Sequence, residues 1–170
     1  MIQQIKWTER KFDLEQPIGM FPITLERLRG TPARLYDMLK ELPAARLIRK
    51  DGAQWSIQEH AGHLLDIEEL HDGRIDDFIT GAAILRAADM TNKKTYLADH
   101  NNAKIENLLE AFKMSRMAFV QRLEKLDESA LQNRALHPRL NVMIQPHQMA
   151  IFIAEHDDQH IAIMRTLINQ

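Results

Sequence analysis

The chain has 170 residues, of which 45% are apolar and 27% are charged, with 22 Lys and Arg against 24 Asp and Glu. This length corresponds to about one domain, large enough to bury a core without a disulfide or a structural metal. The sequence has no Cys, which excludes disulfides, thiolate zinc sites and cysteine nucleophiles. Its net charge of −2 argues against nucleic acid and anionic membrane surfaces as partners, because it produces no field that attracts polyanions.

The first residues and the hydropathy indicate a cytoplasmic protein. Residues 1–11 are too polar for the apolar core of a secretory signal, and no apolar run approaches the ~18 residues that span a bilayer. The sequence shows no internal repeat and no interdomain linker. We therefore expect a single domain over residues 1–170, located in the cytoplasm and without a membrane partner.

The composition is typical of an all-α protein. Val occurs only twice, and every Gly lies at or before Gly81. No segment shows the alternation of apolar and polar residues that is typical of a strand. Pro17, Gly19 and Pro22 predict that the first twenty residues are mostly irregular.

A first helix is predicted from about Thr24 to Leu42, where Pro43 ends it. We expect an interruption near Gly30, because Thr31 and the proline after it are typical of an N-cap followed by a first-turn proline.

A second helix is predicted from about Ser56 to Thr80. Ser56 and Glu59 form the pattern of a capping box, in which each side chain satisfies a backbone N–H of the other residue. Gly81 closes this helix, and the stretch that follows, up to Asn102, has no firm period. It predicts a long connection between the second and third helices.

Two further helices complete the predicted fold. The third shows apolar residues at three- and four-residue steps, at Ile105, Leu108, Phe112, Phe119, Leu123 and Leu126. A loop around His137 and Pro138 precedes the last helix, from about Pro146 to Ile168, whose stripe is Met149, Phe152, His156, His160, Ile163 and Leu167. Four long helices with one long crossover predict a four-helix bundle, a fold whose facing helices commonly build a metal or ligand site.

The last helix carries the clearest candidate for chemistry. His156 and His160 are four residues apart, so their side chains lie one turn apart on an otherwise apolar face. A buried imidazole needs a hydrogen-bond partner or a metal, since an unsatisfied buried polar group costs ~1–3 kcal/mol. The pair alone leaves both interpretations open. It does not indicate a metallopeptidase, because Asp157 stands where the H-E-x-x-H helix has its catalytic Glu.

A third imidazole ligand would come from the second helix, which offers His60, His63 and His71. The apolar stripe of that helix lies closer to His60 and His71, while His63 lies at its edge. Periodicity alone therefore does not choose His63.

Two separated motifs resemble one known family. The stretch from Trp55 to Glu68, WSIQEHAGHLLDIE, followed by Arg74, resembles the W-S-x-x-E-x-x-x-H-L-x-D-x-E…R pattern of the DinB/YfiT-like superfamily. Residues 154–161, AEHDDQHI, are similar to its C-terminal H-x-x-x-H helix. The resemblance covers nearly the whole chain and implies a bundle of the DinB/YfiT type.

The resemblance also implies a metal site. By motif position, the ligands of a divalent metal, nickel or zinc, are His63, His156 and His160. Many relatives have a further His where this chain has Gln159, which we therefore place outside the ligand set. His60 is an extra imidazole that we interpret as a polar neighbour rather than as a substitute ligand or a proton shuttle.

Three neutral imidazoles leave coordination positions open to water or substrate, as in catalytic sites. The resemblance implies a metal-dependent enzyme that transfers a low-molecular-weight thiol to a small molecule or hydrolyses it, and relatives are commonly homodimers. The alternative is a metal-binding stress-response protein without turnover, whose metal is structural. The sequence identifies no catalytic residue beyond the metal ligands.

The other candidates have simpler interpretations. We expect Trp55 to pack at one end of the bundle, and the alternative is that this aromatic residue lines a pocket. For Arg74 we expect an ion pair with a carboxylate, and the alternative is contact with an anionic substrate. The remaining histidines are interpreted as surface, loop or core residues: His71, His100, His137 and His147. Most acidic residues near the motifs are expected on a solvated helix face, with outer hydrogen bonds to imidazoles as the alternative: Asp66, Glu68, Glu69, Asp157 and Asp158.

Overall fold

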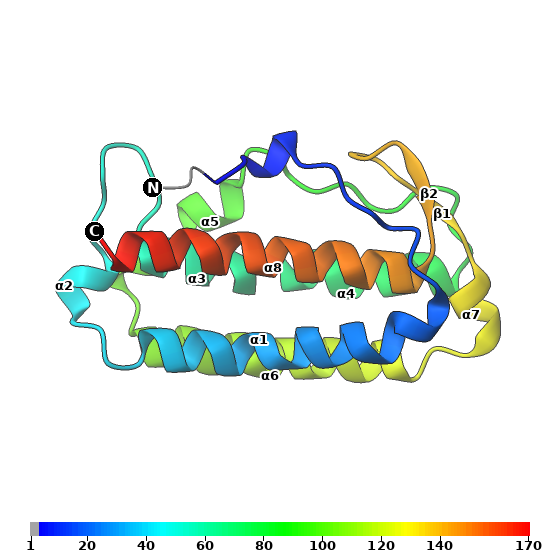
Figure 1. Ribbon diagram of the computed structural model, residues 1–170, viewed down its shortest axis with the longest axis horizontal. Coiled ribbons are helices and arrows are strands. Elements are labelled where there is room, and N and C mark those ends of the chain that lie inside the picture. The colour runs from blue at the N-terminus through cyan, green and yellow to red at the C-terminus, as the bar shows by residue number, and fades with distance from the viewer. Residues whose placement is uncertain (1–3) are drawn as a thin grey trace.

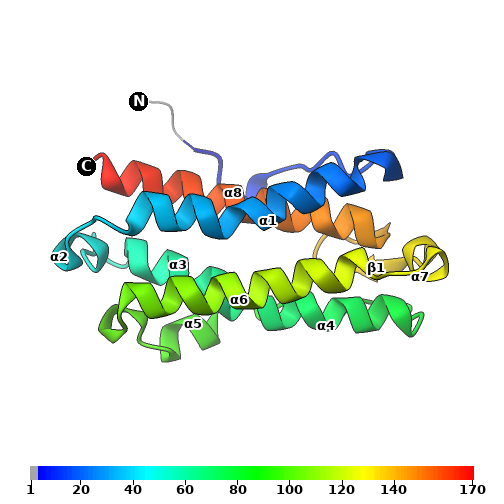
Figure 2. The ribbon, with the colours of Figure 1, turned by 90° about the horizontal axis from the view of Figure 1, so that it is seen from below.

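The computed structural model describes residues 4–170 and contains four long helical rods packed side by side (Figure 1). The rods are α1 (Phe21–Leu39), α3 (Ile57–Asp66) continued by α4 (Glu68–Ile79), α6 (Ile105–Glu124) and α8 (Pro146–Ile168). The rod α1 lies between α6 and α8, and the α3–α4 rod lies between the same two on the opposite side (Figure 2). This arrangement confirms the predicted four-helix bundle.

Short elements connect the rods. The 3-10 turns are η1 (Trp7–Glu9), η2 (Ile18–Met20) and η3 (His100–Asn102), and the short helices are α2 (Ala44–Leu47), α5 (Lys93–Leu97) and α7 (Glu128–Gln132). The crossover between α4 and α6 is long, as predicted, and holds both α5 and η3. Within residues 4–170, no helix combines the length and the apolar composition that crossing a membrane requires.

The predicted interruption of the first helix is wrong. The helix α1 begins at Phe21 and continues through Pro32 to Leu39. Thr31 is not an N-cap, because it lies inside α1, and its hydroxyl donates a hydrogen bond to Asp157 Oδ2 on α8 at 2.8 Å. Buried residues on both sides of Pro32, such as Leu28 and Leu35, stabilise the helix by packing and offset the missing backbone hydrogen bond.

The second rod begins as predicted. Ser56 Oγ accepts from the Glu59 N–H at 3.1 Å, and Glu59 Oε2 accepts from the Ser56 N–H at 2.7 Å. The rod is divided at Ile67, which the sequence does not reveal. Backbone hydrogen bonds from Ile67 to His63 and from His71 to Ile67, both 3.1 Å, keep the two segments end to end.

The expectation of no strands is wrong for one small hairpin. Strands β1 (Ala135–His137) and β2 (Val142–Ile144) pair antiparallel, with Leu136 opposite Met143. Three residues are too few for an alternating pattern to be recognised in the sequence. The hairpin closes the end of the bundle where α7 and α8 meet (Figure 1).

The apolar core has two parts with a polar layer between them. One part includes Phe78, Phe119 and Phe152, and the other includes Leu39 and Phe112. Each rod contributes buried polar side chains to the layer between them: Thr31, His63, Glu68, His71, Arg116, His156, Asp157 and His160. The two apolar parts supply the packing, and the layer holds the chemically active groups.

Candidate metal centre

Three histidines from two rods meet in the polar layer. His156 and His160 lie one turn apart on α8, and His63 faces them from α3. Each offers one ring nitrogen, and the three nitrogens lie within 4.8 Å of one another. All three side chains are buried. The structure thus places His63 with the pair on α8, although periodicity alone favoured its neighbours.

Hydrogen bonds to neighbouring residues orient two of the three rings, those of His63 and His160. His63 Nδ1 lies 3.1 Å from Thr95 Oγ1 on α5. His160 Nδ1 lies 2.8 Å from His60 Nδ1, which makes His60 an outer partner of His160. His160 Nε2 and His156 Nε2 are 3.1 Å apart.

The donor set fits a divalent metal. Burial, followed by the neighbouring His60, lowers the pKa of His63 to about 4. Burial also lowers the pKa values of His156 and His160 well below 6.5, so all three imidazoles are neutral at pH 7, as metal ligation requires. Two nitrogens 3.1 Å apart have the spacing of ligands that each lie about 2.0–2.1 Å from one ion. Within residues 4–170, the buried His156 Nδ1 has no hydrogen-bond partner.

An ion-paired cluster lies beside the histidines. Arg116 on α6 is fully buried and pairs with Glu68 on α4 at 2.7 Å and with Asp157 on α8. Burial alone would raise the pKa of Glu68, but the charge of Arg116 and a hydrogen bond from His71 bring it down to about 2. Thr31 completes the link to α1, so this cluster fixes all four rods at the level of the site.

The predicted solvated face is therefore wrong for three of the acidic residues. Glu68 and Asp157 belong to the buried cluster, and Asp66 Oδ2 lies 2.8 Å from His100 Nε2. Glu69 is exposed as expected, and Asp158 is partly exposed. The sequence does carry a signal for the cluster, because Arg116 occupies the apolar spacing of α6 between buried phenylalanines.

A cavity of about 1090 Å³ opens beside the three histidines. Trp55 lines it and lies 4.8 Å from the His63 ring, so the structure supports the alternative in which this aromatic residue lines a pocket. The residue that sequence reasoning missed is Trp7, whose ring lies 5.1 Å from that of His156. No helical period covers the segment that carries it, and only its tertiary contacts bring it to the site.

The N-terminal segment is held along α8 by polar contacts, on the side of α8 that faces away from α1 (Figure 1). Gln159 is buried and donates to the Ile5 carbonyl at 2.9 Å, while its own amide oxygen accepts from Arg10 at 3.2 Å. Arg10 also pairs with Glu155. The amide of Gln159 is thus used to fasten residues 4–10 as one wall of the cavity.

The predicted ion pair of Arg74 is wrong. Among residues 4–170, its guanidinium contacts no carboxylate. Nε donates to the Arg86 carbonyl at 3.1 Å, and Nη1 lies 3.3 Å from His137 Nε2. Asp77, three residues after Arg74 on α4, is bound by the Arg86 side chain instead.

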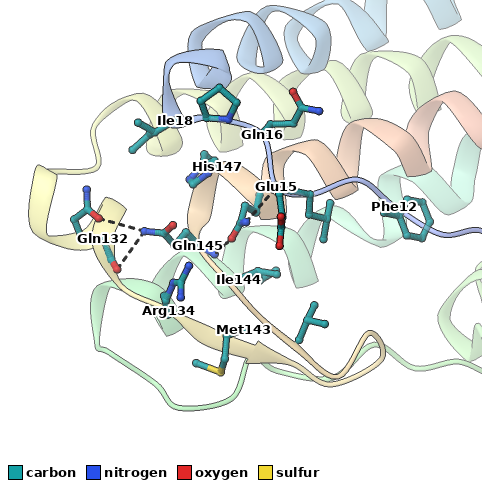
Figure 3. Close-up of a pocket in the computed structure, with 14 residues that line it drawn as sticks. Phe12, Glu15, Gln16, Ile18, Gln132, Arg134, Met143, Ile144, Gln145 and His147 are labelled. Atoms are coloured by element: carbon teal, nitrogen blue, oxygen red, sulfur yellow. Dashed lines mark hydrogen bonds between the residues drawn. The ribbon is translucent and has the colours of Figure 1, made fainter.

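The remaining histidines are buried core residues outside the cluster of three. His71 Nδ1 lies 3.3 Å from Glu68, and its ring lies 6.4 Å from that of His156. His147 lines a separate cavity of about 750 Å³ at the hairpin end, together with Phe12, Arg134 and Gln145 (Figure 3). None of the three clustered histidines lines that second cavity, so we place the candidate site in the larger one.

The fold and the site define a class: a helical bundle with three buried, neutral histidines beside a cavity, suited to a divalent metal. The chain belongs to the DinB superfamily, whose sequence profile matches residues 27–164. Among solved structures it is similar to YfiT from Bacillus subtilis, described as a probable metal-dependent hydrolase with an unusual four-helix bundle topology. The TM-score is 0.80 at 18% identity, over 94% of this chain and 91% of that one. Comparison with curated proteins gives no match.

Proposed function

We propose that His63, His156 and His160 bind one divalent metal and that this centre makes the protein an enzyme acting on a small molecule in the adjacent cavity. The observation that carries the proposal is the meeting of three neutral imidazoles with a cavity of about 1090 Å³. Three protein ligands leave a coordination position for a water, a thiol or a substrate.

The surrounding residues have defined tasks in this proposal. Thr95 holds Nδ1 of His63 and His60 holds Nδ1 of His160, which leaves Nε2 of both rings for the metal. Trp7 and Trp55 limit the access of water to the histidines. A divalent metal bound here would act as a Lewis acid and lower the pKa of a water or a small thiol. The reaction is then hydrolysis of the small molecule or transfer of a low-molecular-weight thiol to it.

Metal content tests the ligand set. Elemental analysis after reconstitution with nickel or zinc is expected to give about one metal per chain, lost in His63→Ala and His160→Ala. His60→Ala is the matched control, because it removes an equally buried imidazole that we place outside the ligand set. We expect it to retain the stoichiometry with an affinity about 10–100-fold weaker. No metal in the parent protein, or loss in His60→Ala alone, would overturn the assignment.

Turnover separates an enzyme from a protein with a structural metal. The metal-loaded protein is assayed with small chromogenic esters and amides, and with a low-molecular-weight thiol and an electrophilic acceptor. Turnover that requires the metal and is lost in His63→Ala supports the enzyme. A metal that raises the unfolding temperature without turnover in either assay would favour the structural alternative.

A further inference from the structure

Arg74 is a buried cation that forms no ion pair with the residues that the structure describes. Its side chain lies in the wall of the large cavity, and the residue is only 2% exposed. Within residues 4–170, Nη2 makes no hydrogen bond, and no carboxylate lies within ion-pair distance of the guanidinium. Leaving a buried charge unpaired is costly, so such a group points to a partner that the chain itself does not supply.

His137 presents a second donor at the same place. Its Nδ1 accepts a hydrogen bond from the Leu140 N–H at 3.2 Å. Burial, followed by the charges of Arg74 and Arg139, lowers the pKa of His137 to about 4, so the ring is neutral at pH 7. A neutral imidazole that accepts at Nδ1 carries its proton on Nε2.

The Nε2 of His137 lies 3.3 Å from Arg74 Nη1. An arginine nitrogen carries only donors, so two N–H groups meet here and neither can accept from the other. The two N–H groups therefore lack an acceptor whose lone pairs could take a hydrogen bond from each of them. A carboxylate oxygen meets this need, and its negative charge also compensates the guanidinium.

Other charged groups in the wall leave this position positive. Arg139 donates to the Trp7 carbonyl at 2.9 Å and, among residues 4–170, pairs with no carboxylate. The acidic residues in the wall are already engaged, Asp66 with His100, Glu69 with Lys94, and Asp89 with the backbone of Thr91. An anion that enters the cavity therefore meets two guanidinium groups that form no ion pair among residues 4–170.

The distance between the Arg74–His137 pair and the three histidines determines the shape of a ligand that reaches both. The His137 ring lies 4.8 Å from that of Phe152, which precedes His156 by one turn, about 6 Å along α8. Phe152, Trp7, Ile67 and Leu70 give the wall between the two positions an apolar character. A molecule that spans them has a carboxylate at one end and an apolar body of a few carbons.

We propose that the cavity binds small carboxylates with an apolar body, with the carboxylate on Arg74 and His137 and the other end at the three histidines. This inference deepens the proposed function and rests on it for the reacting end. Binding of the carboxylate by Arg74 and His137 does not depend on a metal. Failure of one proposal is therefore distinguishable from failure of the other.

The test measures binding to the metal-free and the metal-loaded protein by calorimetry. The probe is hexanoate, and hexanamide is the uncharged control of the same size. We expect hexanoate to bind at least about tenfold more tightly than hexanamide in both forms, as expected for a charge-assisted hydrogen bond. Arg74→Met is expected to abolish this preference without changing metal stoichiometry. Arg134→Met removes an equal charge from the wall of the other cavity and is expected to bind hexanoate like the parent.

A second variant guards against misfolding of the first. His137→Phe keeps the ring against Phe152 and is expected to weaken hexanoate binding several-fold. Equal binding of hexanoate and hexanamide, unchanged hexanoate binding in Arg74→Met, or binding of inorganic phosphate without binding of hexanoate would each overturn the proposal. A protein that binds hexanoate but no metal would uphold the carboxylate site and overturn the metal centre.

Discussion

Replacing Arg116 by Met is expected to lower the free energy of unfolding by about 3–5 kcal/mol at pH 7, the range for breaking a buried ion pair. Arg116 donates to Glu68 at 2.7 and 3.0 Å and to Asp157 at 3.1 Å and through a second, shorter contact. The variant leaves both buried carboxylates without a cation. For a chain of this size, the loss corresponds to a fall of about 10 °C in the unfolding temperature.

Urea denaturation followed by circular dichroism measures this loss, with Arg122→Met as the matched control. Arg122 lies on the same helix, but its side chain is 35% exposed, and it pairs with Asp72 and Asp76 at the surface. We expect that control to lose less than about 1 kcal/mol. A loss in Arg116→Met no larger than in Arg122→Met would refute the argument that the buried cluster stabilises the bundle.

The loss of unfolding free energy in Arg116→Met also depends on pH. Without the guanidinium, burial raises the pKa of Glu68 in the folded variant, which then takes up a proton more readily than the unfolded chain. The variant therefore loses less unfolding free energy, relative to the parent, at pH 5 than at pH 7. An equal deficit at both pH values would contradict this origin of the loss.

Two further predictions concern other parts of the polar layer and its surroundings. Because the pKa of His137 is about 4 in the folded chain and near 6.5 when unfolded, the unfolded state binds more protons between these values, and stability falls as the pH is lowered. In His137→Phe, the metal-free protein should lose about 2 kcal/mol less than the parent between pH 7 and pH 5 in urea titrations; an unchanged loss would refute this. Gly62→Ala places a Cβ 2.3 Å from the His100 ring and should destabilise by about 1–3 kcal/mol, whereas Gly30→Ala meets open space in α1 and should stabilise by about 0.5–1 kcal/mol. Thermal unfolding of the two glycine variants checks this contrast, and a stable Gly62→Ala would contradict it.

The long periodic segments of the sequence predict the bundle because their signals are local. The last helix begins at Pro146 and ends at Ile168 as predicted, and α6 begins at Ile105, the first residue of the predicted apolar stripe. The error at Thr31 has a tertiary cause. Its hydroxyl bonds to Asp157, 126 residues away, and packing carries the helix through the proline.

The candidate site is only partly visible in the sequence. The spacing of His156 and His160 predicts their common face, but the choice of His63 depended on the family resemblance. The contact of Thr95 with His63 and the position of Trp7 beside His156 join residues far apart in the chain. No local pattern encodes such contacts. For Arg74 the sequence offers an anionic substrate only as the less favoured interpretation, because an ion pair with a carboxylate is the ordinary expectation for an arginine on a helix.

The attachment of residues 4–10 to α8 has a consequence for biosynthesis. Gln4 donates to the Gln159 carbonyl across 155 residues of chain, and Arg10 reaches Glu155 across 145. This wall of the cavity therefore cannot close on the ribosome until α8 has been made, even though its own residues are translated first. Two of the three clustered histidines arrive with the same helix. A growing chain thus exposes neither a finished pocket nor a complete set of imidazoles before α8 has been made.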